Sequence, residues 1–115
     1  MKDYIIEPTD YTVTLRATHL KNRYPIAYAS IKVVTEDNKR IGKLVGLIRL
    51  KEFKNLGICE ELIKKRIEIC KTLGCDLVYT AIYYKRTGII KCYKSLGFKE
   101  IEPITPEYVR LIREI

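Results

Sequence analysis

The sequence is poor in the residues that build metal sites and membrane spans. It contains a single histidine, His19, and its four cysteines include no Cys-x-x-Cys pair, so no zinc or other metal site is expected. No apolar run approaches the roughly 18 residues that a membrane-spanning helix needs, and no membrane partner is expected. The N-terminal stretch MKDYIIEP has one lysine and no long apolar segment, which argues against a signal peptide and favours the cytoplasm.

Glutamine is missing and asparagine is scarce, while isoleucine, lysine, tyrosine and glutamate are common. This composition is typical of a thermophile, in which an intracellular disulfide becomes conceivable. Buried free thiols are the default interpretation of the cysteines, and the sequence indicates no pairing among them. They are Cys59, Cys70, Cys75 and Cys92.

The chain has 115 residues, of which 47% are hydrophobic, and this predicts one globular domain over residues 1–115. The net charge of +8 favours anionic partners such as phosphates, nucleic acid or a phosphate-bearing cofactor. Because the lysines and arginines are spread along the chain among glutamates, a solvated surface explains most of them equally well.

The first half of the sequence alternates with the period of β-strands. Segment 11–20 places Val13, Leu15 and Ala17 on one face, and segment 26–34 repeats the pattern with β-branched residues. Segment 41–50 is apolar on both faces, which is typical of a central strand. Polar turns separate the three segments, and an antiparallel meander is therefore predicted.

The period changes to that of a helix over residues 57–73, and Gly74 supplies its end. A strand over 75–84, a short helix over 89–96 and strands over 98–103 and 107–115 follow. Strand, helix and strand in this order form a βαβ unit, so two strands are parallel. The predicted fold class is α/β or α+β, with two helices packed on a mixed, mostly antiparallel sheet.

The helix over 57–73 begins in the loop Lys-Asn-Leu-Gly, without a Ser, Thr or Asp cap. The first N–H groups of a helix lack internal partners and, together with the helix dipole, they attract anions. Gly57 lets the backbone approach a ligand closely, and Lys54 adds a positive charge. The loop therefore suits a phosphate group, although one glycine before a helix is also common in an ordinary turn.

Two stretches at a fixed spacing, KNLGICEELIKKRIE and GIIKCYKSLGFKEI, resemble the GCN5-related N-acetyltransferase family. The family's loop reads Arg/Gln-x-x-Gly-x-Gly/Ala, and its later helix reads Asn-x-x-Ala-x-x-x-Tyr-x-x-x-Gly-Phe. The resemblance covers about residues 44–103. It implies an acetyl-CoA-dependent N-acetyltransferase, without a metal, in which strands 44–50 and 76–82 splay apart to admit the pantetheine arm of the cosubstrate.

The resemblance also implies roles for individual residues. Tyr93 matches the tyrosine that protonates the departing thiolate, and Arg86 could reach a phosphate of CoA. The acyl carbonyl would be polarised by backbone N–H groups near Ile48, Arg49 and Leu50. The pyrophosphate would rest on the loop formed by Lys54, Asn55, Leu56, Gly57, Ile58 and Cys59.

The sequence departs from the family pattern at several positions. Lys54 replaces Arg or Gln, Cys59 replaces a small residue, Arg86 replaces Asn, and Ile89 replaces Ala. Arg49 aligns with a usual Val, unless the loop is shorter by one residue and Leu50 takes that place. Residues 1–40 lack helical periodicity and have no room for the two helices that build the acceptor wall in the family. The resulting open side suits a large or exposed primary amine, and a second copy of the chain, in a homodimer, could complete the wall.

Several assignments stay open at this point. Tyr93 also fits a core position on an apolar helical stripe, and Glu52, Glu36 and His19 are three candidates for the general base. Cys59 at a helix N-terminus could have a lowered pKa, but it is a poor candidate for a nucleophile. The alternative function is a catalytically inactive module of the same fold that binds nucleic acid or a protein partner.

Overall fold

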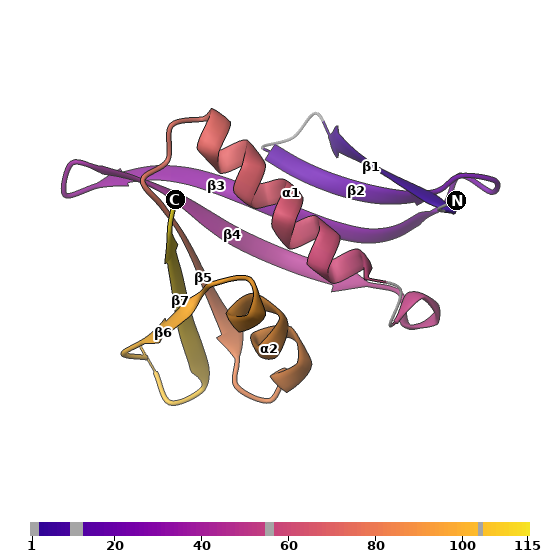
Figure 1. The fold of residues 1–115 in the computed structure, drawn as a ribbon. Coiled ribbons are helices and arrows are strands. Elements are labelled where there is room, and N and C mark those ends of the chain that lie inside the picture. The colour runs from indigo at the N-terminus through magenta and orange to yellow at the C-terminus, as the bar shows by residue number, and fades with distance from the viewer. Residues whose placement is uncertain (1–2, 10–12, 55–56, 104) are drawn as a thin grey trace.

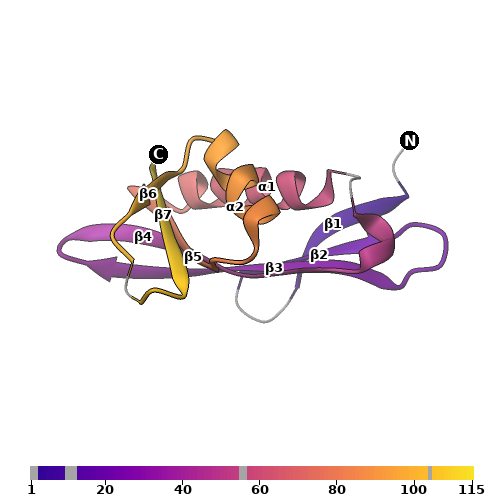
Figure 2. The ribbon, with the colours of Figure 1, turned by 90° about the horizontal axis from the view of Figure 1, so that it is seen from below.

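The protein forms one seven-stranded mixed sheet with two α-helices on the same face (Figures 1 and 2). The computed structural model describes residues 3–9, 13–54, 57–103 and 105–115. In chain order the elements are β1 Tyr4–Thr9, β2 Val13–His19, β3 Pro25–Glu36, β4 Lys39–Arg49, the 3-10 helix η1 Lys51–Phe53, α1 Ile58–Thr72, β5 Leu77–Tyr83, α2 Thr87–Ser95, β6 Lys99–Ile101 and β7 Tyr108–Glu114. The predicted fold class is confirmed.

The predicted antiparallel meander is present as β2, β3 and β4. Strand β1 was not predicted from the sequence, and it pairs antiparallel with β2 at the edge of the sheet. Its Pro8 is compatible with an edge strand, where one side of the backbone has no neighbour in the sheet. No helix lies between β1 and η1 in the residues described, as the sequence predicts for this part of the chain.

Strands β4 and β5 are neighbours and parallel, but they pair only over Ile41–Lys43 and Leu77–Tyr79. Beyond this point they diverge, as expected for strands 44–50 and 76–82. The register between β3 and β4 shifts between Ala29 and Ser30, and Gly46 opposite has a φ of 61°. A bulge of this kind bends a strand and redirects its free edge.

The C-terminal strands are ordered β5, β7, β6, so β6 forms the second edge of the sheet and β7 lies inside it. Strand β7 pairs antiparallel with both neighbours. Helix α1 crosses β3 and β4, and α2 lies beside the β5–β7 part of the sheet (Figure 1). No helix in the described residues has the length and hydrophobicity that a membrane crossing needs.

The core lies between α1, α2 and the face of the sheet that they cover. Strand residues that alternate toward the helices, such as Ala29, Ile31 and Val78, are fully buried. The opposite face carries no helix in the residues described (Figure 2). The cross-strand partners Tyr28 and Ile48 are exposed on that face. The sheet therefore has one packed face and one open face.

Candidate functional site

The N-terminus of α1 has no side-chain cap. Its N-cap residue, Gly57, adopts the left-handed conformation with φ 76° and ψ 9°. The first helical hydrogen bond runs from the N–H of Glu61 to the carbonyl of Gly57, so the N–H groups of Ile58, Cys59 and Glu60 precede the helical ladder. The helix start therefore has the form of an anion site. The predicted contacts of Asn55 and Leu56 lie outside the described residues.

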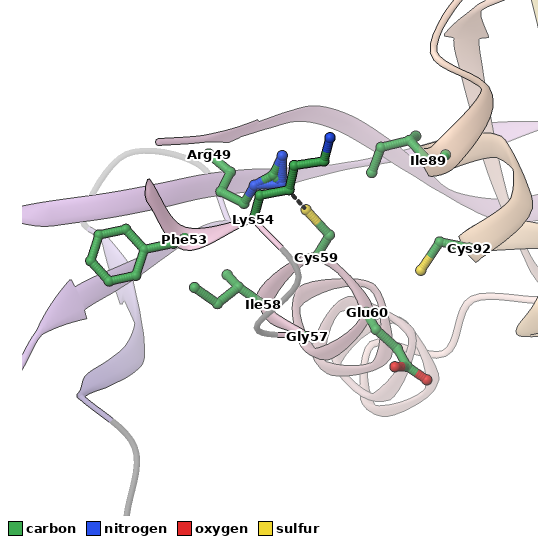
Figure 3. A pocket seen from close by; sticks show the side chains of 10 residues that line it. Arg49, Phe53, Lys54, Gly57, Ile58, Cys59, Glu60, Ile89 and Cys92 are labelled. Carbon is green, nitrogen blue, oxygen red and sulfur yellow. Dashed lines mark hydrogen bonds between the residues drawn. The ribbon is translucent and has the colours of Figure 1, made fainter. Parts of the chain in front are cut away.

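A cavity of about 310 Å³ opens at this helix start and is called the α1 cavity here. Figure 3 shows the side chains of Arg49 and Lys54 on one side of it and those of Ile89 and Cys92, from α2, on the other. Its lining residues are Arg49, Phe53, Lys54, Gly57, Ile58, Cys59, Glu60, Gly88, Ile89 and Cys92. Two cations and the start of a helix thus meet at one concave surface, which favours a polyanionic ligand.

Arg49 contributes an incompletely satisfied guanidinium to this cavity. Its Nη1 lies 3.9 Å from the sulfur of Cys59, a long contact to a weak acceptor. Its Nε is buried and has no hydrogen-bond partner among the residues described. A buried, unpartnered donor is costly, and the residue that carries it lines the cavity.

A second cavity of about 270 Å³ lies where β4 and β5 diverge and is called the strand cavity. It is lined by Lys43, Leu44, Val45, Gly46, Leu47, Ile48, Tyr79, Thr80, Ala81, Ile82, Arg86 and Tyr93. Side chains bridge the gap between the strands: Thr80 Oγ1 donates to the carbonyl of Leu44 at 2.9 Å, and Arg86 Nη2 donates to that of Leu47 at 3.1 Å. The β4 carbonyls on this edge can therefore pair with polar groups placed between the strands.

The sequence named the N–H groups of Ile48, Arg49 and Leu50 as candidates to polarise an acyl carbonyl, and the backbone of β4 shows which edge of the strand each one faces. The N–H of Leu50 donates to Ile26 at 2.9 Å, so it points toward β3. Successive residues of a strand direct their N–H groups to opposite edges, so the N–H of Arg49 faces the same edge as Leu47. The N–H of Ile48, two residues before Leu50, points toward β3 as that of Leu50 does.

Tyr93 lies where α2 meets the strand cavity and is 1% exposed. Its ring packs edge-on against Phe98 at 5.0 Å between centroids, and its hydroxyl oxygen accepts a hydrogen bond of 2.7 Å from Arg66 Nη2. The ring thus belongs to the core, while its cavity-lining position gives the residue a contact with the site. The core interpretation of Tyr93 is therefore confirmed, and its catalytic role stays a prediction.

None of the three candidate bases lines the strand cavity. His19 stacks on Tyr24 at 4.9 Å, Glu36 pairs with Lys43 at 3.2 Å, and Glu52 is exposed on η1. The lining of the strand cavity includes no carboxylate and no histidine among the described residues. An amine acceptor would therefore lose its proton to water or to a group outside this lining.

Two of the four cysteines, Cys70 and Cys75, are buried as expected, whereas Cys59 and Cys92 are half-buried. Burial raises the pKa of the Cys59 thiol, against the opposing field of Arg49, Arg86 and Arg66. The lowered pKa expected at a helix N-terminus is therefore absent, which argues against a thiolate nucleophile. Burial also raises the pKa of Cys92. All four cysteines are free, and the described residues contain no cluster of ligands for a metal ion.

Arg66 is a residue of this region that was not predicted from the sequence. It is 0% exposed on α1, although the helix carries its other charged residues on exposed or half-buried positions. The signal was present in the spacing, because position 66 follows Leu62 by four residues and Ile63 by three, which places it on the same face. Because a charged residue on a helix is normally exposed, Arg66 was not assigned to the buried face.

The fold and the sequence were compared with known proteins. The sequence profile of the acetyltransferase (GNAT) family matches residues 2–98, whereas no curated protein matches. The NatC complex bound to Gag peptide and CoA superposes with a TM-score of 0.81 at 18% identity, over 89% of this chain and 70% of that chain. The GNAT domain of S. lividans PAT gives 0.78 at 15% identity, over 93% of this chain and 64% of that domain.

A third structure, Arabidopsis thaliana Naa50 in complex with the bisubstrate analogue CoA-Ac-MVNAL, gives a TM-score of 0.73 at 16% identity, over 89% of this chain and 72% of that one. The chain thus spans between 64% and 72% of the length of these structures. At such identities the superpositions establish the fold, while the profile covers most of the chain. The chain belongs to the acetyltransferase (GNAT) family.

Proposed function

We propose that the protein transfers an acetyl group from acetyl-CoA to a primary amine in a ternary complex. The observation that carries this proposal is the gap between β4 and β5, which opens after Lys43. Tyr93 of α2 lines the strand cavity in this gap. A pantetheine arm in this gap would pair with the free edge of β4. The pyrophosphate would occupy the α1 cavity, at the uncapped helix start and beside Arg49 and Lys54.

The chemistry needs few protein groups. The amine attacks the acetyl carbonyl, the C–N bond forms, and the C–S bond breaks with its electron pair on sulfur. In this proposal the N–H of Arg49 polarises the carbonyl oxygen, as an oxyanion hole does, and its orientation toward the gap supports this role. Tyr93 gives its hydroxyl proton to the sulfur and recovers one from water. The proton of the amine leaves through the open side of the sheet.

The open side bears on the identity of the acceptor. No helix covers the Tyr28 and Ile48 face in the described residues, which leaves access for an amine carried on a protein or a peptide. Two of the structures with the same fold hold peptide-like ligands: the NatC complex holds a Gag peptide, and Naa50 holds CoA-Ac-MVNAL. A peptide amine is therefore the first acceptor class to test.

The test combines binding with an acceptor screen. Calorimetry with acetyl-CoA should give a one-to-one complex, and thermal unfolding should shift upward with its concentration. Mass spectrometry should then detect a gain of one acetyl group in a library of peptides with free N-termini and internal lysines, with spermidine as a small-amine comparison. Salt-dependent binding of duplex DNA without any effect of acetyl-CoA would overturn the proposal and favour the inactive nucleic-acid module.

A further inference from the structure

Arg66 is a fully buried cation whose hydrogen-bond partners in the described residues are all neutral acceptors. Its side chain is 0% exposed and donates three hydrogen bonds. Nε bonds the carbonyl of Leu62 at 3.3 Å, Nη1 bonds the carbonyl of Ser30 at 3.2 Å, and Nη2 bonds the hydroxyl of Tyr93 at 2.7 Å. No ion pair of Arg66 exists within the part of the chain that the structure describes.

Packing alone does not require this residue. Its neighbours on the buried face of α1, such as Leu62, Ile63 and Ile67, are apolar. Burying a guanidinium without a counter-charge is unfavourable, and apolar side chains of similar volume commonly replace buried charges without loss of stability. Two of its three bonds go to backbone carbonyls, which hold the guanidinium plane in place. Among the residues that the structure describes, the third is its only bond to a side chain, and that side chain is Tyr93.

The direction of this bond makes the oxygen of the Tyr93 hydroxyl a hydrogen-bond acceptor. A guanidinium has donors and no acceptor, so Arg66 donates and the tyrosine oxygen accepts. The Tyr93 hydroxyl therefore does not donate its proton to Arg66, and the described residues provide no other acceptor for that proton. Because Tyr93 lines the strand cavity, the proton remains available to a group bound there.

We propose that Arg66 is a positioning residue that holds the Tyr93 hydroxyl as a proton donor toward the strand cavity. When the C–S bond of acetyl-CoA breaks, the Tyr93 O–H bond breaks and an S–H bond forms. The negative charge moves from sulfur to the phenol oxygen, 2.7 Å from the guanidinium nitrogen. A buried cation at this position stabilises that charge without reorganisation. This inference rests on the proposed acetyl transfer.

The test is a double-mutant cycle on kcat with Arg66→Met, Tyr93→Phe and the double variant. The assay follows CoA release from acetyl-CoA with the peptide of highest turnover from the library. Arg66→Met should lower kcat by about tenfold or more, a part of the usual effect of a general acid. The KM for acetyl-CoA should stay within about twofold, because Arg66 lines neither cavity. In the Tyr93→Phe background, Arg66→Met should cause no further loss of kcat.

Ile63→Ala is the matched control, since Ile63 is also 0% exposed on α1 and lines neither cavity. Any effect of this variant on kcat should be equal with and without the Tyr93→Phe substitution, as expected for a loss of packing. All variants are assayed well below their unfolding temperatures. If Arg66→Met does not fold, Arg66→Lys takes its place in the cycle, because it keeps the charge and loses the planar fork that bonds Ser30 and Tyr93 together.

An equal loss of kcat from the Arg66 variant in both backgrounds would overturn the inference and leave Arg66 a structural residue. A rise in KM with kcat unchanged would overturn it as well. If Tyr93→Phe has full activity, or if the unaltered protein acetylates no peptide, the proposed chemistry fails instead. The cycle thus separates the failure of the Arg66 assignment from the failure of the function on which it rests.

Discussion

Gly42 of β4 lies directly under Cys70 of α1. A Cβ atom built at position 42 would lie 2.4 Å from the sulfur of Cys70, closer than any ordinary contact. The glycine therefore sets the distance between α1 and the sheet, and it is the middle one of the three β4 residues that pair with β5. This contact keeps α1 against the strand that later lines both cavities.

Gly42→Ala should accordingly lower the free energy of unfolding by about 1–3 kcal/mol, the usual cost of overpacking a core. Urea denaturation measures the change through the midpoint and the m-value. The double variant Gly42→Ala/Cys70→Ala removes the sulfur that the new methyl group meets, and much of the loss should be recovered. If the double variant is as unstable as the sum of the single variants, the contact does not set the spacing of α1.

The sequence predicted the elements whose periodicity is strong. Strands β2, β3 and β4 and helix α1 agree with the prediction to within a few residues, because one face of each is buried against the core. Strand β1 was missed because its short pattern is interrupted by Pro8. The place of β7 between β5 and β6 depends on pairing between distant segments, which local periodicity does not encode.

The candidate site was predictable where a motif fixed the backbone. Gly57 at the helix start and Tyr93 beside the strand cavity follow from the two family stretches. Arg66 was not predictable in the same way, since a charged residue on a helix is normally exposed. The sequence allowed Arg86 to reach a phosphate of CoA, and this stays a prediction. The observed bond from Arg86 to the carbonyl of Leu47 depends on the distance between β4 and α2, which local sequence does not encode.

Tyr93→Phe should lower turnover by about 10²–10⁴-fold, because the departing thiolate loses its proton donor. The affinity for CoA should change little, since the ring stays in place. Because the hydroxyl accepts a hydrogen bond from buried Arg66, its loss should lower the free energy of unfolding by about 1–3 kcal/mol.

Tyr4→Phe is the matched control for that variant. Tyr4 is also buried, its hydroxyl donates to Glu61 on α1, and it lines neither cavity. The turnover of the Tyr4→Phe variant should remain near that of the unaltered protein even if the variant is less stable. Turnover within about threefold for Tyr93→Phe would mean that water supplies the proton.

Arg49→Met should weaken CoA binding by about 10–100-fold. The guanidinium lines the α1 cavity with an unpartnered buried Nε, and a hydrogen bond to a charged group contributes about 1.5–3 kcal/mol. Calorimetry at several salt concentrations measures the effect. Arg40→Met removes the same charge from the exposed start of β4 and should leave the affinity nearly unchanged. Equal losses in both variants would indicate a general effect of net charge.

Cys59 should react slowly with iodoacetamide at neutral pH. Burial raises the pKa of its thiol, so at a given pH its thiolate fraction is below that of free cysteine. The rate should rise steadily as the pH is raised, and bound CoA should slow it because Cys59 lines the α1 cavity. Peptide mass spectrometry separates Cys59 from the other cysteines. Alkylation faster than that of free cysteine at about pH 7 would contradict the raised pKa.

Gly57→Glu and Gly74→Glu form a matched pair at the two ends of α1. Both glycines have a left-handed φ, 76° and 77°, and a Cβ atom at either position would meet nothing within 4 Å. Glutamate is strained equally in this conformation, so both variants should lose stability. The helix dipole favours the carboxylate at position 57 and disfavours it at position 74, so Gly57→Glu should be the more stable of the two.

The order of CoA affinities should be the reverse. At position 57 the carboxylate would lie where the pyrophosphate is proposed to bind, and like charges brought together cost several kcal/mol, which weakens binding by about 100-fold or more. Position 74 lies at the far end of the helix, so Gly74→Glu should bind CoA as the unaltered protein does. Equal CoA affinities in the two variants, measured by calorimetry, would exclude the N-terminus of α1 as the pyrophosphate site. Since Gly57→Glu is expected to be the more stable variant, its loss of affinity could not be attributed to unfolding.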